Sequence, residues 1–336
     1  MDAFPLIDVE LLRDDTTALP VLADQIHRAC VDWGFFLVVG HGVDAQLCRR
    51  LAALSQRFFA QDIAVKQAIR MALSGPAWRG YFRLGDELTS GQPDQKEGLY
   101  FGAELDDGDP SVMAGWPLHG KNLFPALEGF RETVLEYLSQ LTHLGHRLMR
   151  GIALSLGLEA AYFHEHYTWD PLVLLRIFCY PSRASLGTLA QRSGEPSWGV
   201  GEHTDYGLLT ILQQDAVGGL AVKGRSGWVD VPTIPGAFVC NLGDMLECMS
   251  GGIYRSTPHR VRNHPSQQRL SIPFFFDPHW EAVVRPLPSV PSNRRSTAPR
   301  WDRASVYDEN GTYGDYILKK IGRVFPELAR RTRPDS

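Results

Sequence analysis

The segment "GEHTDYGLLTIL" (residues 201–212) places a histidine and an aspartate two positions apart, directly before an apolar run. Side chains at positions i and i+2 of an extended segment point to the same side. His203 and Asp205 would therefore face a common point if they lie in a strand or at its end. The apolar residues that follow are typical of a buried strand. The segment predicts β-structure that presents two potential metal ligands.

Short strands are also expected on both sides of this segment. After about residue 170 the hydrophobic period changes from 3.6 towards 2. Turn residues separate a series of β-branched or aromatic segments: "LVLLRIFCYP" (172–181), "LLTILQQD" (208–215), "LAVKG" (220–224), "WVDVP" (228–232), "AFVCNLGDMLECMS" (237–250), "YRSTPHRVRN" (254–263) and "RLSIPFFFDP" (269–278). Seven or eight short antiparallel strands of this kind indicate a sandwich or jelly roll rather than a parallel sheet.

The N-terminal half shows helical periodicity instead. Apolar spacings of three and four predict helices at 22–33, at 44–58 with Asp44 as N-cap, and at 127–152. A last helix is expected from about residue 315. Residues 74–122 are rich in Gly, Pro and Asp and are expected to be irregular, with one strand at "GLYFGAEL" (98–105).

We therefore expect an α+β fold with a jelly-roll core, a helical N-terminal half and a C-terminal helix. Four divisions of one compact unit follow from the change in period. They are an N-terminal α/β region with an irregular substrate-side segment (1–122), a long supporting helix (123–168), the jelly-roll core (169–285) and a C-terminal segment with its helix (286–336).

Composition excludes several classes of protein. The 336 residues are 44% hydrophobic and 21% charged, with a net charge of −4, which argues against a nucleic-acid-binding protein. No run of 18 apolar residues predicts a membrane span, and the N-terminus lacks the pattern of a secretory signal. The five cysteines form no CxxC pair, so we expect reduced thiols in a cytoplasmic protein. The sequence indicates no oligomeric state.

A metal site needs a third ligand, and His259 is the best candidate among the eleven histidines. It lies on a predicted core strand, where a hairpin can return it to the end of the barrel that carries His203. Two imidazoles and one carboxylate leave three positions open on an octahedral ion, which suits iron(II). Taken alone, the His–x–Asp pair is more often a surface pair or a core histidine.

Ten positions after His259, Arg269 and Ser271 are again two residues apart on a predicted strand. A buried arginine is costly unless it meets an anion, and its planar fork fits a carboxylate with two hydrogen bonds. An internal pair with Asp or Glu would also satisfy it. An open metal site beside a carboxylate anchor is nevertheless what a 2-oxo-dicarboxylic acid requires, with one end on the metal and the other on the arginine.

These motifs together resemble the iron(II)- and 2-oxoglutarate-dependent dioxygenases of the isopenicillin N synthase-like family. The resemblance spans about residues 5–325 and includes "PLIDVELL" (5–12), "WGFFLVVGHGV" (33–43), "DQKE" (94–97), "RIFCYP" (176–181) and "NLGDMLECMSGGIYRSTPHRV" (241–261). It implies a double-stranded β-helix, which is a variant of the jelly roll. It also implies iron(II), 2-oxoglutarate and dioxygen as cofactor and co-substrates, with ascorbate as a candidate reductant.

Carried over residue by residue, the resemblance gives specific roles. The metal ligands would be His203, Asp205 and His259, and the anchor for 2-oxoglutarate would be Arg269 with Ser271 and Tyr180. Phe178 stands where many relatives have Asn, which removes a polar contact near the metal-bound end of the co-substrate. Asn241 and Asp244 are expected to shape a turn. Candidate substrate contacts are Phe275, Phe178, Tyr81 and Phe101.

The implied reaction hydroxylates, or otherwise oxidises, an unactivated C–H bond of a small organic molecule such as a secondary metabolite, releasing succinate and carbon dioxide. Desaturation, ring closure and demethylation use the same oxidant. Two alternatives remain on this scaffold: an oxidase or cyclase that needs no 2-oxoglutarate, and an ethylene-forming activity. A non-enzymatic alternative is a sensor that binds carboxylates. Arg79, Arg83, Lys96 and Arg176 could meet a substrate carboxylate, although structural pairing explains each of them as well.

Overall fold

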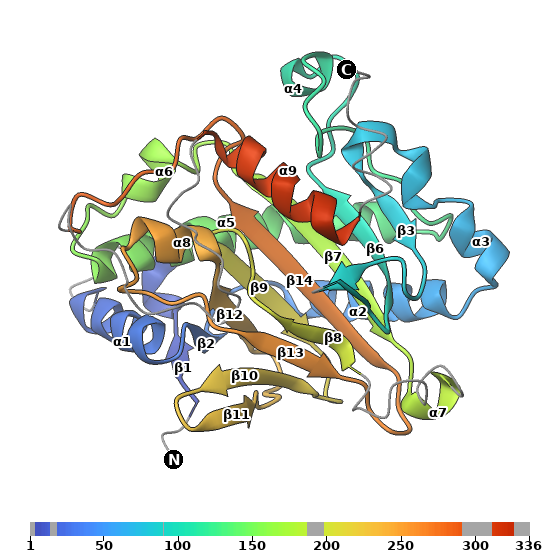
Figure 1. Cartoon of the computed structure of the whole chain (residues 1–336), viewed down its shortest axis with the longest axis horizontal. Helices are drawn as coiled ribbons and strands as arrows, with labels where there is room; N and C mark the ends of the chain where they lie inside the picture. The colour runs from blue at the N-terminus through green and yellow to red at the C-terminus, as the bar shows by residue number, and fades with distance from the viewer. Residues whose placement is uncertain (1–3, 14–18, 90, 187–197, 291–310, 326–336) are drawn as a thin grey trace.

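The computed structural model describes residues 4–13, 19–89, 91–186, 198–290 and 311–325. Two sheets face each other (Figure 1). The larger sheet contains, in spatial order, β1 (Leu6–Asp8), β2 (Phe35–Val39), β12 (Phe238–Leu242), β9 (Leu209–Gln214), β14 (Arg269–Asp277), β7 (Leu172–Tyr180), β6 (Glu97–Gly102) and β3 (Gly80–Phe82). The smaller sheet contains β11 (Gly227–Asp230), β10 (Leu220–Gly224), β13 (His259–Arg262) and β8 (Trp198–His203). A separate hairpin consists of β4 (Leu88–Thr89) and β5 (Gln92–Pro93).

Helices cover the outer face of the larger sheet. The helices in the described ranges are α1 (Leu19–Asp32), α2 (Ala45–Phe59), α3 (Ile63–Gln67), α4 (Pro110–Met113), α5 (Phe130–Ser155), α6 (Tyr162–His166), α7 (Arg183–Leu186), α8 (Asp244–Met249) and α9 (Tyr313–Val324). Three short 3₁₀ turns occupy Glu10–Arg13, Met71–Leu73 and Gly75–Ala77. Helix α5 contacts β14, β9 and β7 and also packs against α1 and α2. Asp44 caps α2, because its carboxylate accepts a hydrogen bond from the Gln46 N–H.

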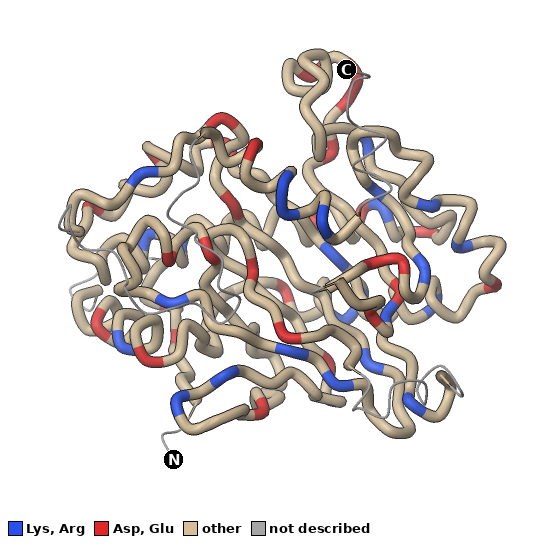
Figure 2. The backbone as a smooth tube through the Cα atoms, viewed as in Figure 1, with Lys and Arg blue, Asp and Glu red and all other residues tan. Residues whose placement is uncertain are grey.

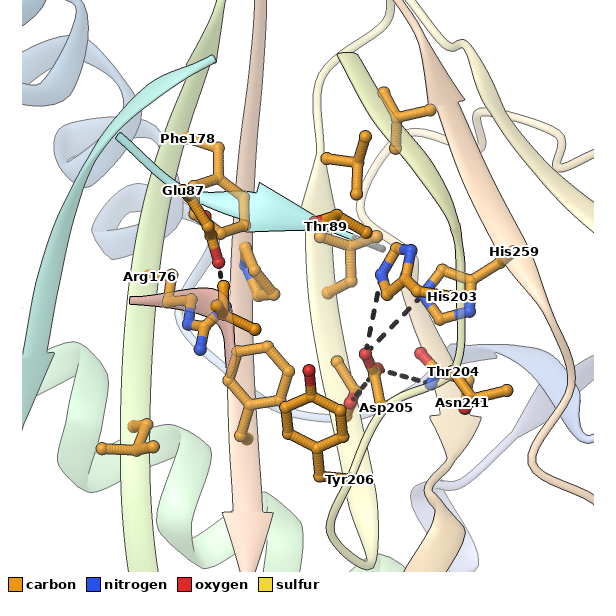
Figure 3. Close-up of a pocket in the computed structure, with 18 of the residues that line it drawn as sticks. Glu87, Thr89, Arg176, Phe178, His203, Thr204, Asp205, Tyr206, Asn241 and His259 are labelled. Carbon is orange, nitrogen blue, oxygen red and sulfur yellow. Dashed lines mark hydrogen bonds and ion pairs between the residues drawn. The ribbon is translucent and has the colours of Figure 1, made fainter. Parts of the chain in front are cut away.

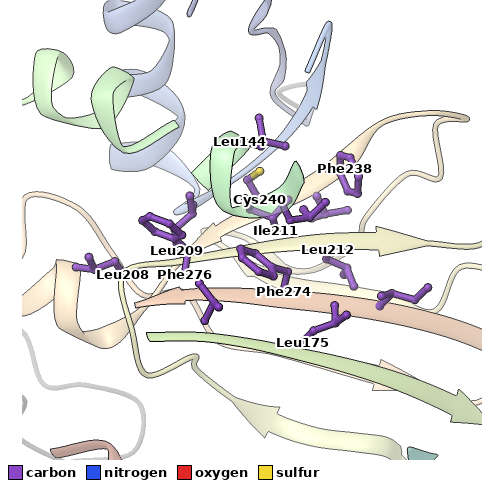
Figure 4. Close-up of a cluster of buried hydrophobic side chains, with 14 of the residues drawn as sticks. Leu144, Leu175, Leu208, Leu209, Ile211, Leu212, Phe238, Cys240, Phe274 and Phe276 are labelled. Atoms are coloured by element: carbon purple, nitrogen blue, oxygen red, sulfur yellow. The ribbon is translucent and has the colours of Figure 1, made fainter. Parts of the chain in front are cut away.

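Alternation along β14 separates the core of the protein from its cavity. Leu270, Ile272, Phe274 and Phe276 are buried in the hydrophobic core, whereas Arg269, Ser271, Pro273, Phe275 and Asp277 line the cavity between the sheets. Figure 4 shows Phe274 and Phe276 packed with Ile211 and Leu209 of β9 beneath Leu144 of α5. Burial of each such side chain contributes roughly 1.5–3 kcal/mol. The polar residues of β14 are thus held on a firmly packed strand.

The expected α+β fold with a jelly-roll core is confirmed, and two local expectations are corrected. The strand expected at 98–105 is present as β6, but the region 74–122 also supplies β3, and β6 pairs with β7, so the larger sheet extends beyond residues 169–285. The segment 237–250 is not one strand, because a helix, α8, begins at Asp244 immediately after β12 ends. Leu246 and Met249 of α8 are fully buried, which favours the helix over further strand pairing. Parts of the expected C-terminal segment, 291–310 and 326–336, lie outside the described residues.

Along the backbone tube of Figure 2, the positions of Lys and Arg are interspersed with those of Asp and Glu. In the described ranges no helix combines the length and the apolar character needed to cross a membrane.

A glycine at the contact between α5 and β14 gives a first prediction. A Cβ atom on Gly145 would lie 2.4 Å from Cδ2 of Phe276, whose ring is fully buried. We expect Gly145→Ala to lower the free energy of unfolding by about 1–3 kcal/mol, because overpacking outweighs the helix propensity gained. Urea denaturation measures this change. Adding Phe276→Leu should make the pair less destabilised than the sum of the single variants; strict additivity would contradict the proposed clash.

Candidate metal centre and co-substrate site

Two histidines and one aspartate converge at one end of the cavity. His203 ends β8 and His259 begins β13, and the two residues are direct partners in the antiparallel pairing of these strands. Their ring centroids lie 4.2 Å apart. Asp205 Oδ1 is 3.9 Å from Nε2 of His203 and 3.7 Å from Nε2 of His259. Figure 3 shows the three side chains pointing toward one another, two from the segment that ends β8 and one from the start of β13.

Backbone carbonyls orient both imidazoles. Nδ1 of His203 lies 2.8 Å from the Gly201 carbonyl oxygen, and Nδ1 of His259 lies 3.1 Å from that of Thr257. Each Nδ1–H can donate to its carbonyl, which leaves Nε2 as the lone-pair donor directed at Asp205. Burial and the neighbouring His259 lower the pKa of His203 to about 3, so this ring is neutral. A neutral imidazole is the form that binds a metal.

The carboxylate of Asp205 is held through its second oxygen. Oδ2 accepts hydrogen bonds from Oγ1 of Thr210 at 2.5 Å and from Nδ2 of Asn241 at 2.7 Å. Burial acts to raise the pKa of this carboxyl, but His259, His203 and these two hydrogen bonds outweigh it and hold the pKa below its ordinary value. Asp205 is therefore ionised, with Oδ1 directed at the two imidazoles.

This donor set fits a divalent metal ion. The ligand atoms of His203, Asp205 and His259 lie within 4.8 Å of one another, and each residue can offer one atom. Three facial donors leave three positions for other ligands on an octahedral ion, an arrangement that non-haem iron(II) sites share. The arrangement can hold one ion and still admit a bidentate ligand.

Arg269 lies deeper in the same cavity as a buried cation. Its side chain is 0% exposed, and Nε, Nη1 and Nη2 meet no hydrogen-bond acceptor in the part of the chain that is described. The internal ion pair that the sequence left open is not found there. An unmatched buried guanidinium is strongly unfavourable, so the site fits a carboxylate ligand that arrives with two parallel hydrogen bonds.

The neighbours of Arg269 complete this part of the cavity. Ser271 lies two residues along β14 on the same side, and Tyr180 of β7 is the register partner of Arg269. The Arg269 guanidinium carbon lies 5.0 Å from the centroid of the Tyr180 ring. Phe178 is paired with Ser271 and also lines the cavity, which has a volume of about 390 Å³. The sheet register thus brings together the four residues expected to surround the co-substrate.

The expected substrate contacts divide into two pairs. Phe275 and Phe178 line the cavity, whereas Tyr81 and Phe101 are not among its lining residues in the described ranges. The Tyr81 hydroxyl donates to Glu97 at 2.5 Å, and Phe101 stacks on Phe124. Both side chains belong to the hydrophobic core instead. We therefore exclude these two residues from the site.

Two supports of the metal ligands were not anticipated. Asn241 was expected to shape a turn, but it lies within β12 and binds Asp205. Thr210 lies within β9, next to β12 in the sheet. The sequence contains one signal for Thr210, which follows Asp205 at the start of an apolar strand. For Asn241 the signal is a polar residue that ends a buried run, "FVCN" (238–241).

These supports give a second prediction. We expect Asn241→Leu to weaken iron(II) binding by about 10- to 100-fold, because partners of ligating carboxylates tune affinity on that scale. Anaerobic competition with a chromophoric chelator measures the affinity. Thr210→Val should act in the same direction, whereas Thr142→Val, which loses a bond to the Leu138 carbonyl on α5, should have no effect. Unchanged affinity in both site variants would contradict this role.

Family models match most of the chain. Residues 4–127 match the N-terminal domain of non-haem dioxygenases in morphine synthesis, and residues 172–278 match the 2OG-Fe(II) oxygenase superfamily. The first match covers the chain from β1 to α4, including β3 and β6, and ends before α5. The second covers β7 to β14 and thus every residue that converges on the metal site.

Individual proteins are similar over nearly their whole length. A probable iron/ascorbate oxidoreductase of Dictyostelium discoideum is 48% identical, covering 98% of this chain and 96% of that protein. A 1-aminocyclopropane-1-carboxylate oxidase of the same organism is 37% identical, covering 97% and 96%. A homoarginine-6-hydroxylase of Glycine max is 36% identical, covering 98% and 97%.

A solved structure supports the same relationship. The crystal structure of a full-length Neurospora crassa protein in complex with alpha-KG and thymine superimposes with a TM-score of 0.77 at 27% identity. The superposition covers 95% of this chain and 96% of that one. The similarity therefore includes both sheets and the helices around them.

Proposed function

Because the chain belongs to the 2OG-Fe(II) oxygenase superfamily and is a non-haem iron enzyme that uses 2-oxoglutarate, we propose that it oxidises a free amino acid. The single observation that carries the proposal is a pair of buried polar atoms in the cavity wall, Nε of Arg176 and Oδ1 of Asp277, that have no hydrogen-bond partner among the described residues. A zwitterion offers a carboxylate acceptor for the first atom and an ammonium donor for the second.

We assign the parts of the reaction to residues as follows. His203, Asp205 and His259 would hold iron(II), and Arg269 with Ser271 and Tyr180 would hold the far carboxylate of 2-oxoglutarate. The chemistry supplied by the bound iron is the activation of dioxygen at the expense of 2-oxoglutarate, which leaves as succinate and carbon dioxide. The chain's own contribution is to orient both substrates and to exclude water from the reacting atoms.

Arg176 is the proposed anchor for the substrate carboxylate. It lies on β7, and its guanidinium carbon is 4.2 Å from the ring centroid of Tyr100 and 4.9 Å from that of Phe275. Nη1 donates to Glu87 at 3.1 Å, but Nε is buried without an acceptor among the described residues. The aromatic rings fix the plane of the guanidinium, so its unmatched edge can receive a carboxylate. Figure 3 shows Arg176 across the cavity from the metal ligands.

Asp277 is the proposed partner of the substrate ammonium group. It ends β14 and lines the cavity, and its Oδ1 is buried without a donor among the described residues. Burial raises the pKa of this carboxyl to about 7. A bound cation would stabilise the ionised form. Relatives at 36–37% identity are named for oxidation of 1-aminocyclopropane-1-carboxylate and of homoarginine, both of which are amino acids, and this supports the substrate class.

A substrate screen tests the proposal. Purified enzyme with iron(II), ascorbate, oxygen and 2-oxoglutarate is incubated with free amino acids and with the matching carboxylic acids that lack the amino group. We expect succinate formation coupled to an oxidised amino acid, and little coupling with the amino-free analogues. Efficient coupled oxidation of neutral molecules, and none of amino acids, would overturn the proposal.

Arg176 provides the third prediction. Arg176→Met should raise KM for the amino acid by about 10- to 100-fold, since a buried charge-assisted pair is lost, and should leave the Kd for 2-oxoglutarate within about twofold. Steady-state kinetics and calorimetry measure the two constants. Arg50→Met is the matched control, because Arg50 pairs with Glu136 on the helical side of the protein. Equal weakening of both ligands would instead assign Arg176 to the co-substrate.

A second candidate is favoured by one observation. One relative, 37% identical over nearly the whole chain, is named as a 1-aminocyclopropane-1-carboxylate oxidase, so the alternative on this scaffold that needs no 2-oxoglutarate is tested alongside the first candidate. The two candidates differ in their products. Ethylene without succinate would establish the second candidate, and ethylene from 2-oxoglutarate alone would establish the ethylene-forming alternative. Succinate in proportion to oxidised amino acid would support the first.

The cellular location is part of the proposal. All five cysteines are free thiols, and burial raises the pKa of Cys30, Cys179 and Cys240. Free thiols in the protonated form, together with a need for iron(II), are compatible with a reducing compartment. We therefore propose that the enzyme acts in the cytoplasm.

A further inference from the structure

A buried lysine in the cavity wall has no role in the assignments above. Lys96 precedes β6, and its side chain is 2% exposed and lines the cavity. The ammonium group lies 2.7 Å from Oε2 of Glu87 and also contacts Oδ2 of Asp94. A buried ammonium group is stable only where its charge and its donors are matched. The hydrogen bond to Asp94 uses one of the three N–H donors of Lys96, and Glu87 completes the charge match as an ion pair.

Lys96 lies near residues of the 2-oxoglutarate site. Nζ lies 4.7 Å from the centroid of the Phe178 ring. Its charge contributes to the electrostatic environment of Tyr180, beside Arg269, and to that of His203 in the metal triad. Lys96 therefore lies in the cavity wall beside Phe178, next to the strand pairing of Glu97 with Cys179 that precedes Tyr180. Phe178 fills this part of the wall with carbon atoms only and offers no hydrogen-bond donor.

We propose that a further N–H of Lys96 donates to the metal-chelating end of 2-oxoglutarate. Arg269 and Ser271 account for the far carboxylate, whereas the chelating end keeps acceptor lone pairs that a metal ion does not use. A cation held beside that end by two carboxylates supplies a charge-assisted hydrogen bond without bringing excess positive charge into the cavity. The inference rests on the use of 2-oxoglutarate by this chain and does not depend on the amino-acid substrate.

A purely structural role for Lys96 makes different predictions. Glu87 and Asp94 flank the β4–β5 hairpin, and the backbone N–H of Asp94 donates to the Glu87 carbonyl at 2.9 Å. Oδ2 of Asp94 also accepts a hydrogen bond from Thr89. If Lys96 only stabilised this hairpin, any substitution that destabilised the hairpin would weaken 2-oxoglutarate binding as much as loss of the lysine does. If Lys96 contacts the co-substrate, only loss of its ammonium group would weaken binding.

Ligand binding without turnover separates the two roles. Calorimetry under anaerobic conditions, with manganese(II) in place of iron(II), measures the Kd of 2-oxoglutarate and of 2-oxovalerate, which lacks the far carboxylate. We expect Lys96→Met to weaken both ligands by the same factor, about tenfold or more. Lys66→Met is the matched control, because Lys66 is a buried lysine that is paired with Glu97 and does not line the cavity. It should leave both constants within about twofold.

Two further variants keep the test decisive. Asp94→Asn loosens the hairpin but retains the ammonium group, so both constants should change by less than about twofold. The double variant Lys96→Met/Asp94→Asn removes one buried charge of each sign, and it replaces the single variant if that does not fold. The proposal is overturned if 2-oxovalerate binds Lys96→Met, or the double variant, as tightly as the wild type. It is also overturned if Asp94→Asn alone reproduces the loss.

Discussion

His203→Ala should reduce turnover by at least about 1,000-fold while 2-oxoglutarate still binds weakly. Removing Nε2 leaves one imidazole and one carboxylate, and the metal can then no longer be held in a three-donor site. Arg269 remains in place, so the far carboxylate of 2-oxoglutarate keeps its partner. Iron content after anaerobic loading measures metal binding, succinate formation measures turnover, and calorimetry measures the affinity for 2-oxoglutarate.

The control for this variant is a histidine outside the cavity. His143→Ala removes an exposed imidazole on α5, whose Nδ1 lies 2.7 Å from the Ser139 carbonyl oxygen one turn earlier, and should keep turnover within about twofold. If His203→Ala turned over at the wild-type rate, the ligand assignment would be wrong. Asp205→Ala and His259→Ala should behave like His203→Ala, because all three donors act on one ion.

The second large effect concerns the arginine anchor. Arg269→Met should weaken 2-oxoglutarate binding by about 100- to 1,000-fold, since breaking a buried pair of charges costs about 3–5 kcal/mol. The same substitution should leave the affinity for 2-oxovalerate nearly unchanged, because this ligand has no far carboxylate. The ratio of the two dissociation constants therefore reports the anchor directly.

The neighbouring hydroxyl provides a graded comparison. Ser271→Ala should weaken 2-oxoglutarate binding by only about 2- to 10-fold, which corresponds to the loss of one hydrogen bond.

Thermal unfolding of Arg269→Met tests whether Arg269 has an internal partner in the ligand-free protein. The unmatched guanidinium destabilises the ligand-free protein, so the variant should melt no lower than the wild type in the absence of 2-oxoglutarate. A large loss of stability would mean that Arg269 has an internal partner after all.

Much of the site could be predicted because strand periodicity is exact. The spacing of His203 and Asp205, and that of Arg269 and Ser271, placed each pair on one side of an extended segment. The structure has both pairs facing the cavity. The same reasoning failed for Tyr81 and Phe101, because the sequence pattern of 74–122 did not reveal that these side chains are buried in the hydrophobic core rather than in the cavity wall.

The sequence by itself determined the change from a helical to a strand-rich half and the residue types that can bind a metal and a dicarboxylate, since both follow from local spacing and side-chain chemistry. Only the tertiary structure decided which distant residues meet. Register between β8 and β13 sets His259 opposite His203, and sheet order brings Asn241 to Asp205 and Lys96 to Phe178. Such pairings depend on long-range packing, in which each strand is positioned by neighbours far away in the chain, and no local pattern encodes them.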